Sequence, residues 1–209
     1  MTYIAPLADM RFALREIAGL AGVAALPGYE HATDDTVDAV LEEAAKLAGN
    51  GLAPLNREGD KAGAKLENGV VRTPPGFAGL YKEFVDGGWN SLPFDPAFGG
   101  QGMPWLLATT VQEMWQAANM GFGLVLLLNQ GAIDAIHHHG SEEQKAIYLP
   151  KMISGEWTGT MNLTEPQAGS DLAQLKSRAV KNGDHYLVRG QKIFITYGEH
   201  DMAENIVHL

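Results

Sequence analysis

The sequence has 209 residues, of which 45% are hydrophobic and 19% are charged, a balance that predicts a globular chain with a sizeable core. Its 15 Lys and Arg against 25 Asp and Glu give a net charge of −10, which argues against nucleic acid as a partner. The absence of cysteine excludes disulfides and thiolate metal sites. The N-terminus has no basic segment followed by an apolar one, so we expect a cytoplasmic protein.

Residues 1–33 are predicted to form an N-terminal extension with one short helix. The apolar residues of this helix recur with helical spacing from Met10, and a pair of glycines ends it. The apolar positions in residues 37–48 recur every three or four residues and predict a longer helix, which Thr33 can cap.

Residues 49–77 are rich in Gly, Pro and Asn and have weak apolar periodicity. They are predicted to form a long surface connection with at most a short turn of helix or strand. The segment GFAGLYKEFVDGGW then predicts another helix, which Gly87 and Gly88 close.

Two helices are predicted over residues 104–118 and 121–138. A capping box of Ser141 with Gln144 predicts a further short helix through Met152. The apolar run GFGLVLLLNQGAIDAI is interrupted by polar residues, so we interpret it as a core helix and not as a membrane span.

After Gly155 the sequence becomes alternating or β-rich, in the segments EWTGTMNL, LKSRAV, HYLVRGQKIFIT and ENIVHL. NGD at 182–184 predicts a hairpin between two of them. The expected fold class is therefore α+β, an N-terminal all-α helical bundle over residues 34–153 followed by an antiparallel β domain over residues 154–209. Because the last predicted strand ends at Leu209 with an unpaired edge, we expect this β domain to be incomplete.

Two groups of residues suggest sites but favour a structural interpretation. The glycines in GFG at 121–123 and in GGQG at 99–102 lack the full dinucleotide or P-loop patterns and are expected to punctuate helices. Three consecutive histidines at 137–139 cannot converge on one metal ion from a regular helix, so they favour a polar last turn over a metal site.

The stretch MNLTEPQAGSDL at 161–172 carries the strongest functional pattern. Thr164 ends a predicted strand, Pro166 fixes a turn, and Gly169 with Ser170 can present bare N–H groups and a hydroxyl to an anion. A polar loop of Asx or Ser/Thr turns accounts for the same residues equally well. The residues alone therefore leave the ligand open.

TEPQAGSD at 164–171, followed by GQKIFIT at 190–196, resembles the paired signature of the flavin-dependent acyl-CoA dehydrogenases. The loop ending in FGGQG and the segment HGSEEQKAIYLPKMISGEW are similar to the same family. The extension YIAPLADMRFALREI resembles that of the longer bacterial members, a branch that includes the methylthiopropionyl-CoA dehydrogenases.

This resemblance implies FAD as the cofactor and assigns roles to individual residues. Met161, Leu163 and Thr164 would lie along the flavin ring, and the Thr164 hydroxyl would bond its pyrimidine edge. The remaining implied FAD ligands are Gly169 and Ser170 at the pyrophosphate, Phe194 on the ring face and Thr196 near N5, and Ser170 would also lie near the CoA arm.

Two of these positions depart from the family pattern. Family members often have an aromatic residue in place of Met161 and usually Trp in place of Phe194. Both substitutions keep a large apolar contact, so they are interpreted as variation within a working flavin site.

The implied reaction is the α,β-dehydrogenation of an acyl-CoA, in which a glutamate removes the α-proton and flavin N5 accepts the β-hydride. Four carboxylates near the signature are not assigned as this base: Glu113, Glu142, Glu143 and Glu165. The base and a C-terminal helical domain are expected outside this chain, which would leave the chain alone inactive. The alternative is a non-catalytic binding or assembly module with a degenerate flavin site.

The resemblance also implies partners. These are an acyl-CoA substrate, an electron-transferring flavoprotein as electron acceptor, and further copies of the chain in a dimer or tetramer.

Overall fold

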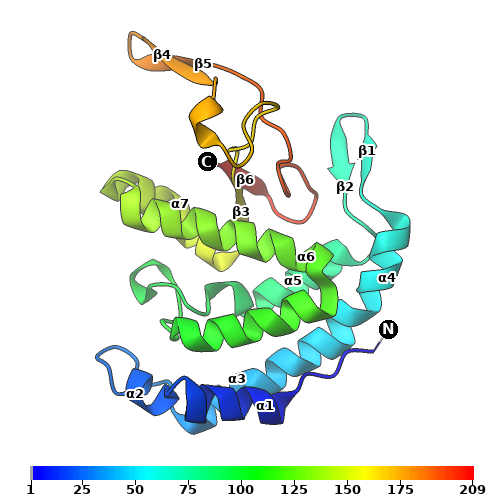
Figure 1. The fold of residues 1–209 in the computed structure, drawn as a ribbon, viewed down its shortest axis with the longest axis vertical. Helices are drawn as coiled ribbons and strands as arrows, with labels where there is room; N and C mark the ends of the chain where they lie inside the picture. Colours follow the sequence, from blue (N-terminus) through cyan, green and yellow to red (C-terminus); the bar gives the residue numbers. More distant parts are fainter. Residues whose placement is uncertain (1) are drawn as a thin grey trace.

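The computed structural model describes residues 2–209, in which a stack of helices lies beside a smaller region of strands (Figure 1). In chain order the helical elements are α1 (Leu7–Phe12), η1 (Ala13–Ile17), α2 (Leu20–Ala24), α3 (Asp34–Leu47), η2 (Ala48–Leu52), α4 (Ala53–Ala62), α5 (Phe77–Asp86), η3 (Trp89–Ser91), η4 (Pro96–Phe98), α6 (Trp105–His139), α7 (Glu142–Ser154) and η5 (Leu172–Gln174). The strands are β1 (Lys65–Glu67), β2 (Val70–Arg72), β3 (Trp157–Thr160), β4 (Arg178–Asn182), β5 (His185–Arg189) and β6 (Asn205–His208). This order confirms the predicted fold class, helices first and a small sheet region after them.

The long helix α6 is the centre of the bundle. It packs against α3, α4, η2, α7 and β3, and Leu107, Met114, Phe122 and Ile133 on it are almost completely buried. Within residues 2–209, α6 is the single helix whose length and composition would allow it to cross a membrane, although 44% of its most apolar stretch is buried inside the protein. In this bundle it is the core helix.

The backbone of α6 breaks at Asn119, between the two helices that the sequence predicts. Asn119 has φ −158° and ψ 88°, outside the helical range, and its side chain is buried. Its Oδ1 accepts a hydrogen bond from Phe122 N at 3.1 Å and its Nδ2 donates one to Leu52 O at 3.2 Å. Asn119 therefore caps the second half of α6 and ties the break to η2.

The prediction of a long surface connection over residues 49–77 was wrong. The chain continues as the π-turn η2 and the helix α4, and glycine is the reason that this helix was missed. A Cβ on Gly51 would lie 2.9 Å from Leu80 Cδ1, and one on Gly59 would lie 2.8 Å from Phe77 Cε1. These glycines are packing surfaces against α5, where sequence reasoning treats glycine as a helix breaker.

The rest of that segment forms the hairpin β1–β2, which pairs antiparallel from Lys65↔Arg72 to Glu67↔Val70. Asn68 and Gly69 make its turn with φ values of 53° and 83°. A two-residue hairpin turn of type I′ requires positive φ at both positions, and Asn-Gly is its favoured sequence.

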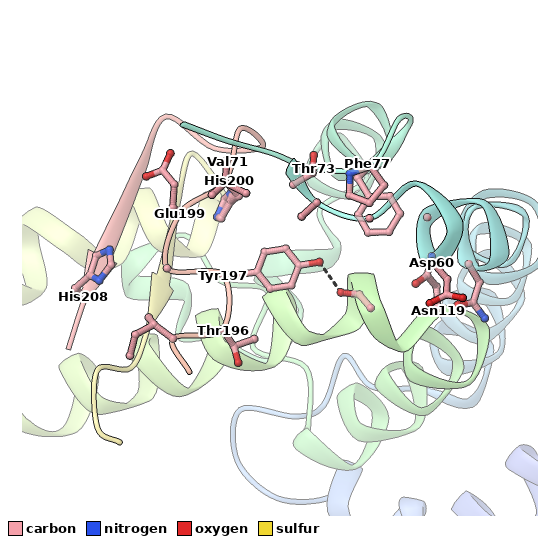
Figure 2. Close-up of a pocket in the computed structure, with 18 of the residues that line it drawn as sticks. Asp60, Val71, Thr73, Phe77, Asn119, Thr196, Tyr197, Glu199, His200 and His208 are labelled. Atoms are coloured by element: carbon pink, nitrogen blue, oxygen red, sulfur yellow. Dashed lines mark hydrogen bonds between the residues drawn. The ribbon is translucent and has the colours of Figure 1, made fainter. Parts of the chain in front are cut away.

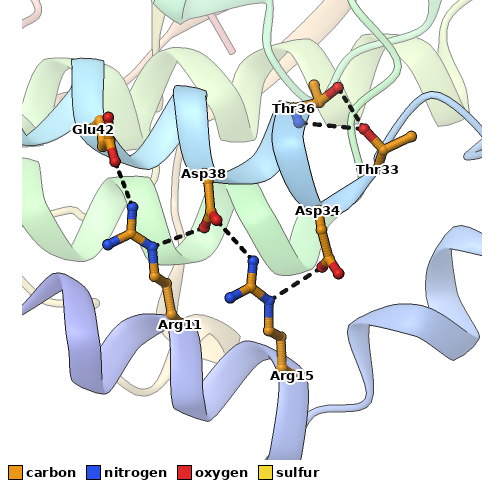
Figure 3. A network of polar contacts seen from close by, with 7 residues as sticks. All are labelled: Arg11, Arg15, Thr33, Asp34, Thr36, Asp38 and Glu42. Atoms are coloured by element: carbon orange, nitrogen blue, oxygen red, sulfur yellow. Dashed lines mark hydrogen bonds and ion pairs between the residues drawn. The ribbon is translucent and has the colours of Figure 1, made fainter.

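Two arginines join the N-terminal extension to the bundle (Figure 3). Arg11 Nε donates to Asp38 Oδ1 at 2.8 Å, and Arg15 Nη2 donates to Asp38 Oδ2 at 2.9 Å. The arginines hold the pKa of Asp38 below its usual range, with hydrogen bonds from Arg11 and then Arg15 as the main causes. Arg11 also pairs with Glu42 at 2.7 Å, and Arg15 also pairs with Asp34 at 3.1 Å.

Both helix caps predicted on α3 and α7 are present, at Thr33 and Ser141.

The strands form three two-stranded sheets. The predicted NGD hairpin is confirmed, because β4 and β5 pair antiparallel from Arg178↔Arg189 to Asn182↔His185. However, β3 and β6 pair in parallel, because the long connection between them returns to the start of β3, where Glu204 N donates to Glu156 O at 3.1 Å. Residues 190–195, predicted as strand, are irregular.

Candidate functional site

The two signature segments of the sequence lie side by side. Ile193 N donates to Thr164 O at 2.9 Å, and Lys192 Nζ donates to Leu163 O at 3.0 Å. The structure therefore brings residues 161–170, which follow β3, next to residues 190–196, which follow β5. The residues that the resemblance assigns to FAD come from both segments.

Three of these residues expose apolar side chains. Met161 is 42% exposed, Leu163 is 38% exposed and Phe194 is 86% exposed. We call these three residues the apolar ledge. Asn162, between the first two, instead lines a cavity, as expected where neighbouring side chains of an extended segment point to opposite sides. Exposed apolar side chains on two adjoining segments can form a surface suited to a planar ring.

Phe194 also has an unusual backbone. Its φ is 57°, and that of Tyr197 is 52°, in the left-handed region that bulky residues rarely adopt. Two such residues within four positions mark the end of the second signature segment as strained. Strain of this kind is concentrated at binding and active sites in proteins generally.

Gly169 and Ser170 lie in an exposed bend directly after the turn that follows Thr164. An isolated bridge between Glu165 and Ala168 closes this turn. No atom lies within 4 Å of the position that a Cβ on Gly169 would take, and Ser170 is exposed. This bend therefore offers open backbone to a ligand from outside, as an anion-binding loop would.

A cavity of about 1320 Å³ adjoins residues 192–200 (Figure 2). Helix α4, the segment after β2, the break in α6 and residues 192–200 form its walls, and Figure 2 shows Thr73, Asn119, Thr196, Tyr197 and His200 around it. Of the seven residues predicted to bind the cofactor, only Thr196 lines this cavity. Thr160 Oγ1 donates to Thr196 O at 2.6 Å and fixes it to β3.

Contacts between the helices and the strand region lie along this cavity. The Tyr197 hydroxyl donates to Gly121 O at the break in α6. Thr73 donates from both N and Oγ1 to Asp201 Oδ1, at 3.0 and 2.7 Å. The helix break and residues 197–201 therefore hold the two regions together.

Two titratable groups of the cavity wall are neutral at physiological pH. Burial raises the pKa of Tyr197 to about 12 and lowers that of His200. His200 Nδ1 accepts from Met202 N at 3.2 Å, so a neutral ring carries its proton on Nε2 and donates it to Thr158 Oγ1 at 2.9 Å.

The carboxylates discussed from the sequence do not lie at the cavity. Within residues 2–209, neither Glu113, Glu142, Glu143 nor Glu165 lines it. Glu165 is 3% exposed and pairs with Lys192 at 2.8 Å. The three histidines form the last turn of α6, and the described residues contain no cluster of three or more His, Cys, Asp or Glu that could hold a metal ion.

Sequence reasoning missed several residues of this region. Lys192 stands inside the quoted GQKIFIT segment, but its role depends on a partner 27 positions earlier. Tyr197 and His200 contact α6 and β3, which no local pattern indicates. Asn119 had one signal, its place in the gap between two predicted helices.

Comparison with known proteins finds one family for both regions of the chain. Residues 34–156 match the model of the acyl-CoA dehydrogenase N-terminal domain, and residues 160–207 match that of the middle domain. The 3-methylmercaptopropionyl-CoA dehydrogenase of Ruegeria pomeroyi is 49% identical, over 100% of this chain and 36% of the relative. A butyryl-CoA dehydrogenase of Syntrophomonas wolfei is 35% identical, over 99% of this chain and 35% of the relative.

A solved structure shares the fold. The butyryl-CoA dehydrogenase of Megasphaera elsdenii matches 79% of this chain and 42% of its own, with a TM-score of 0.67 and 26% identity. The chain spans about a third of the length of the curated relatives that it matches. Because both family models match in order and together cover most of the sequence, the chain belongs to the acyl-CoA dehydrogenase family.

Proposed function

We propose that this chain is the helical and flavin-binding part of an enzyme that oxidises an acyl-CoA to the 2-enoyl-CoA, with FAD as its cofactor. The observation that carries the proposal is the junction of the two signature segments, where Ile193 N bonds Thr164 O and the apolar ledge is exposed beside it. A surface of this kind on a chain of this family is suited to the flavin ring.

The residues present fit the cofactor. The apolar ledge offers Met161, Leu163 and Phe194 to the flavin ring, and Thr164 adds a hydroxyl at its polar edge. The open turn at Gly169 and Ser170 allows close approach of a pyrophosphate to bare N–H groups. Bound FAD would supply the hydride acceptor, and the protein's part is to orient the ring and exclude water around it.

The catalytic base we propose is a glutamate outside residues 2–209. Glu165 cannot serve, because Lys192 and backbone N–H groups occupy its oxygens and keep it ionised. The pKa of Glu165 is held well below its usual range, first by Lys192 and then by Ser177 and Lys176. A base that takes an α-proton near neutral pH needs a pKa close to the working pH.

The substrate we propose is a short acyl-CoA, and the first to test is 3-methylmercaptopropionyl-CoA. The relative of that specificity is 49% identical to this chain over its whole length, whereas the butyryl-CoA relative is 35% identical. Identity of this degree supports a shared substrate class.

For partners we propose an electron-transferring flavoprotein and further copies of the chain. A structural neighbour with a TM-score of 0.66 is described as the electron-transferring flavoprotein of Acidaminococcus fermentans. The exposed strands β4 and β5 are available for contacts with other chains.

Anaerobic mixing of acyl-CoA substrates with the flavin-loaded full-length enzyme, which includes the segment that carries the proposed base, tests this function. We expect the visible flavin absorbance to bleach with 3-methylmercaptopropionyl-CoA, more slowly with butyryl-CoA, and not with a long-chain thioester. A protein that binds FAD but is bleached by none of the three would favour the non-catalytic module instead.

A further inference from the structure

The side chain of Glu165 is the point where three separate segments of the chain meet. Its Oε1 accepts from Lys192 Nζ at 2.8 Å and from Ser177 N at 3.0 Å. Its Oε2 accepts from Lys176 N at 2.8 Å and from Gln167 Nε2 at 2.6 Å. Four donors thus surround a carboxylate that is only 3% exposed. A buried charge with this many donors is fixed in place, since moving it would leave unpaired groups behind.

Two of the segments around Glu165 pack closely against each other. A Cβ on Gly190 would lie 1.9 Å from Ser177 Oγ, so only glycine permits the chain after β5 to pass beside Ser177. Gly190 has a φ of 156°, which other residues rarely adopt. Residues 177 and 190 therefore lie in direct contact, and their two segments both donate hydrogen bonds to Glu165, from Ser177 N and from Lys192 Nζ.

Glu165 and Lys192 both lie close in the chain to residues of the flavin site. Glu165 follows Thr164 directly in the chain. Lys192 donates to Leu163 O as well as to Glu165, at 3.0 Å, and lies two residues before Phe194. One ammonium group thus bridges both signature segments, and the ion pair sets the spacing between Leu163 and Phe194, two members of the apolar ledge.

We propose that Glu165 and Lys192 are positioning residues for FAD. Their ion pair touches neither cofactor nor substrate, but it fixes the position of the signature segment 161–170 relative to the signature segment 190–196. The proposal rests on the proposed function, in that it requires FAD at the apolar ledge. In metal sites, mutation of the residues that hold the ligands in place commonly lowers affinity by one or two orders of magnitude, and we expect a comparable effect on FAD here.

The test uses Glu165→Gln, Lys192→Met, the double variant and Lys192→Arg. Each protein is stripped of flavin, and its FAD dissociation constant is measured by quenching of flavin fluorescence. Unfolding of the apoprotein helices is followed in parallel by far-ultraviolet circular dichroism. The matched control is Lys46→Met, which breaks an exposed ion pair with Glu43 on α3, away from the signature segments.

We expect each single variant to raise the FAD dissociation constant about tenfold or more. The double variant should not raise it further than the more severe single variant does, because all three variants remove the same ion pair. Lys192→Arg keeps the charge and should stay within about threefold of the wild type. The helical unfolding transition of the double variant should stay close to that of the wild type, and Lys46→Met should change neither readout.

Dissociation constants of Glu165→Gln and Lys192→Met that lie within twofold of the wild type would overturn the proposal. So would variants that fail to fold, because the pair would then be a folding element and not a device for positioning the flavin. A wild-type protein that binds no FAD is a separate result, which overturns the proposed function itself.

Discussion

The helical region and the strand region of this chain are held together in different ways. Side chains of α6 such as Phe122 and Met114 are completely buried against neighbouring helices, so the helical region has its own core. In contrast, every residue of β4 and β5 is exposed, and these strands pair only with each other. A two-stranded hairpin is marginally stable alone, so the stability of this outer hairpin depends on the rest of the chain and on what binds it.

The largest expected effect tests the helical core. Phe122 meets Phe77 edge to face at 5.7 Å and Phe84 at 6.3 Å between ring centroids. Phe122→Ala should lower the free energy of unfolding by about 3–5 kcal/mol, because it leaves a cavity that rigid helices cannot close. Urea denaturation measures this change, and a loss below about 1 kcal/mol would show that the core is not the main source of stability.

The break in α6 should have the next largest effect. Asn119→Ala removes the cap on Phe122 N and leaves the buried Leu52 carbonyl without its donor, so we expect a loss of about 2–3 kcal/mol. Asn119→Ser keeps a capping oxygen and should lose less. Equal losses in the two variants, measured by the same denaturation, would mean that the cap contributes nothing.

The comparison predicts a different response at the apolar ledge. Phe194 is 86% exposed, so Phe194→Ala should leave the unfolding free energy of the apoprotein unchanged. The same variant should weaken FAD binding by about 1–3 kcal/mol, the range for losing an aromatic contact with its buried area. Phe194→Trp should bind FAD at least as tightly as the wild type. A destabilised Phe194→Ala apoprotein would instead place Phe194 in the core of the strand region.

A change of pH tests the link between the two regions at His200. Burial lowers the folded-state pKa of His200, against a smaller raising effect of Glu199 and Asp201. As pH falls below about 6.5, His200 is therefore protonated in the unfolded chain but still neutral in the folded chain. The free energy of unfolding decreases until the pH reaches the folded-state pKa of His200. Above about 6.5 this group adds no pH dependence. Denaturation at several pH values should show this loss in the wild type and a flatter profile in His200→Gln.

The smallest effect is expected on the outer strands. Val188 is 76% exposed in β5, so Val188→Ala should change the unfolding free energy by less than about 0.5 kcal/mol. A loss of 1 kcal/mol or more would mean that β4 and β5 are covered in solution. Sedimentation analysis of the same protein would then show whether a second copy covers them.

The parts of the fold that depend on neighbouring residues could be predicted from the sequence. Thr33 and Ser141 cap their helices through hydrogen bonds from residues three positions later, so the starts of α3 and α7 could be predicted from the sequence. Helix α4 could not be predicted, because Gly51 and Gly59 act through contacts with α5 that only the folded chain creates. The paired signatures predict where the flavin surface lies, and the structure brings the two signature segments together. The role of Glu165 stayed hidden because most of its donors lie 11 to 27 positions away.

Hydrogen exchange with and without FAD tests the central claim most directly. If the strand region carries the flavin surface and the helical core stands by itself, FAD should slow exchange in residues 161–170 and 190–196 and leave α3 unchanged. Slowed exchange in α3 but not in the two signature segments, or no FAD binding at all, would contradict this account.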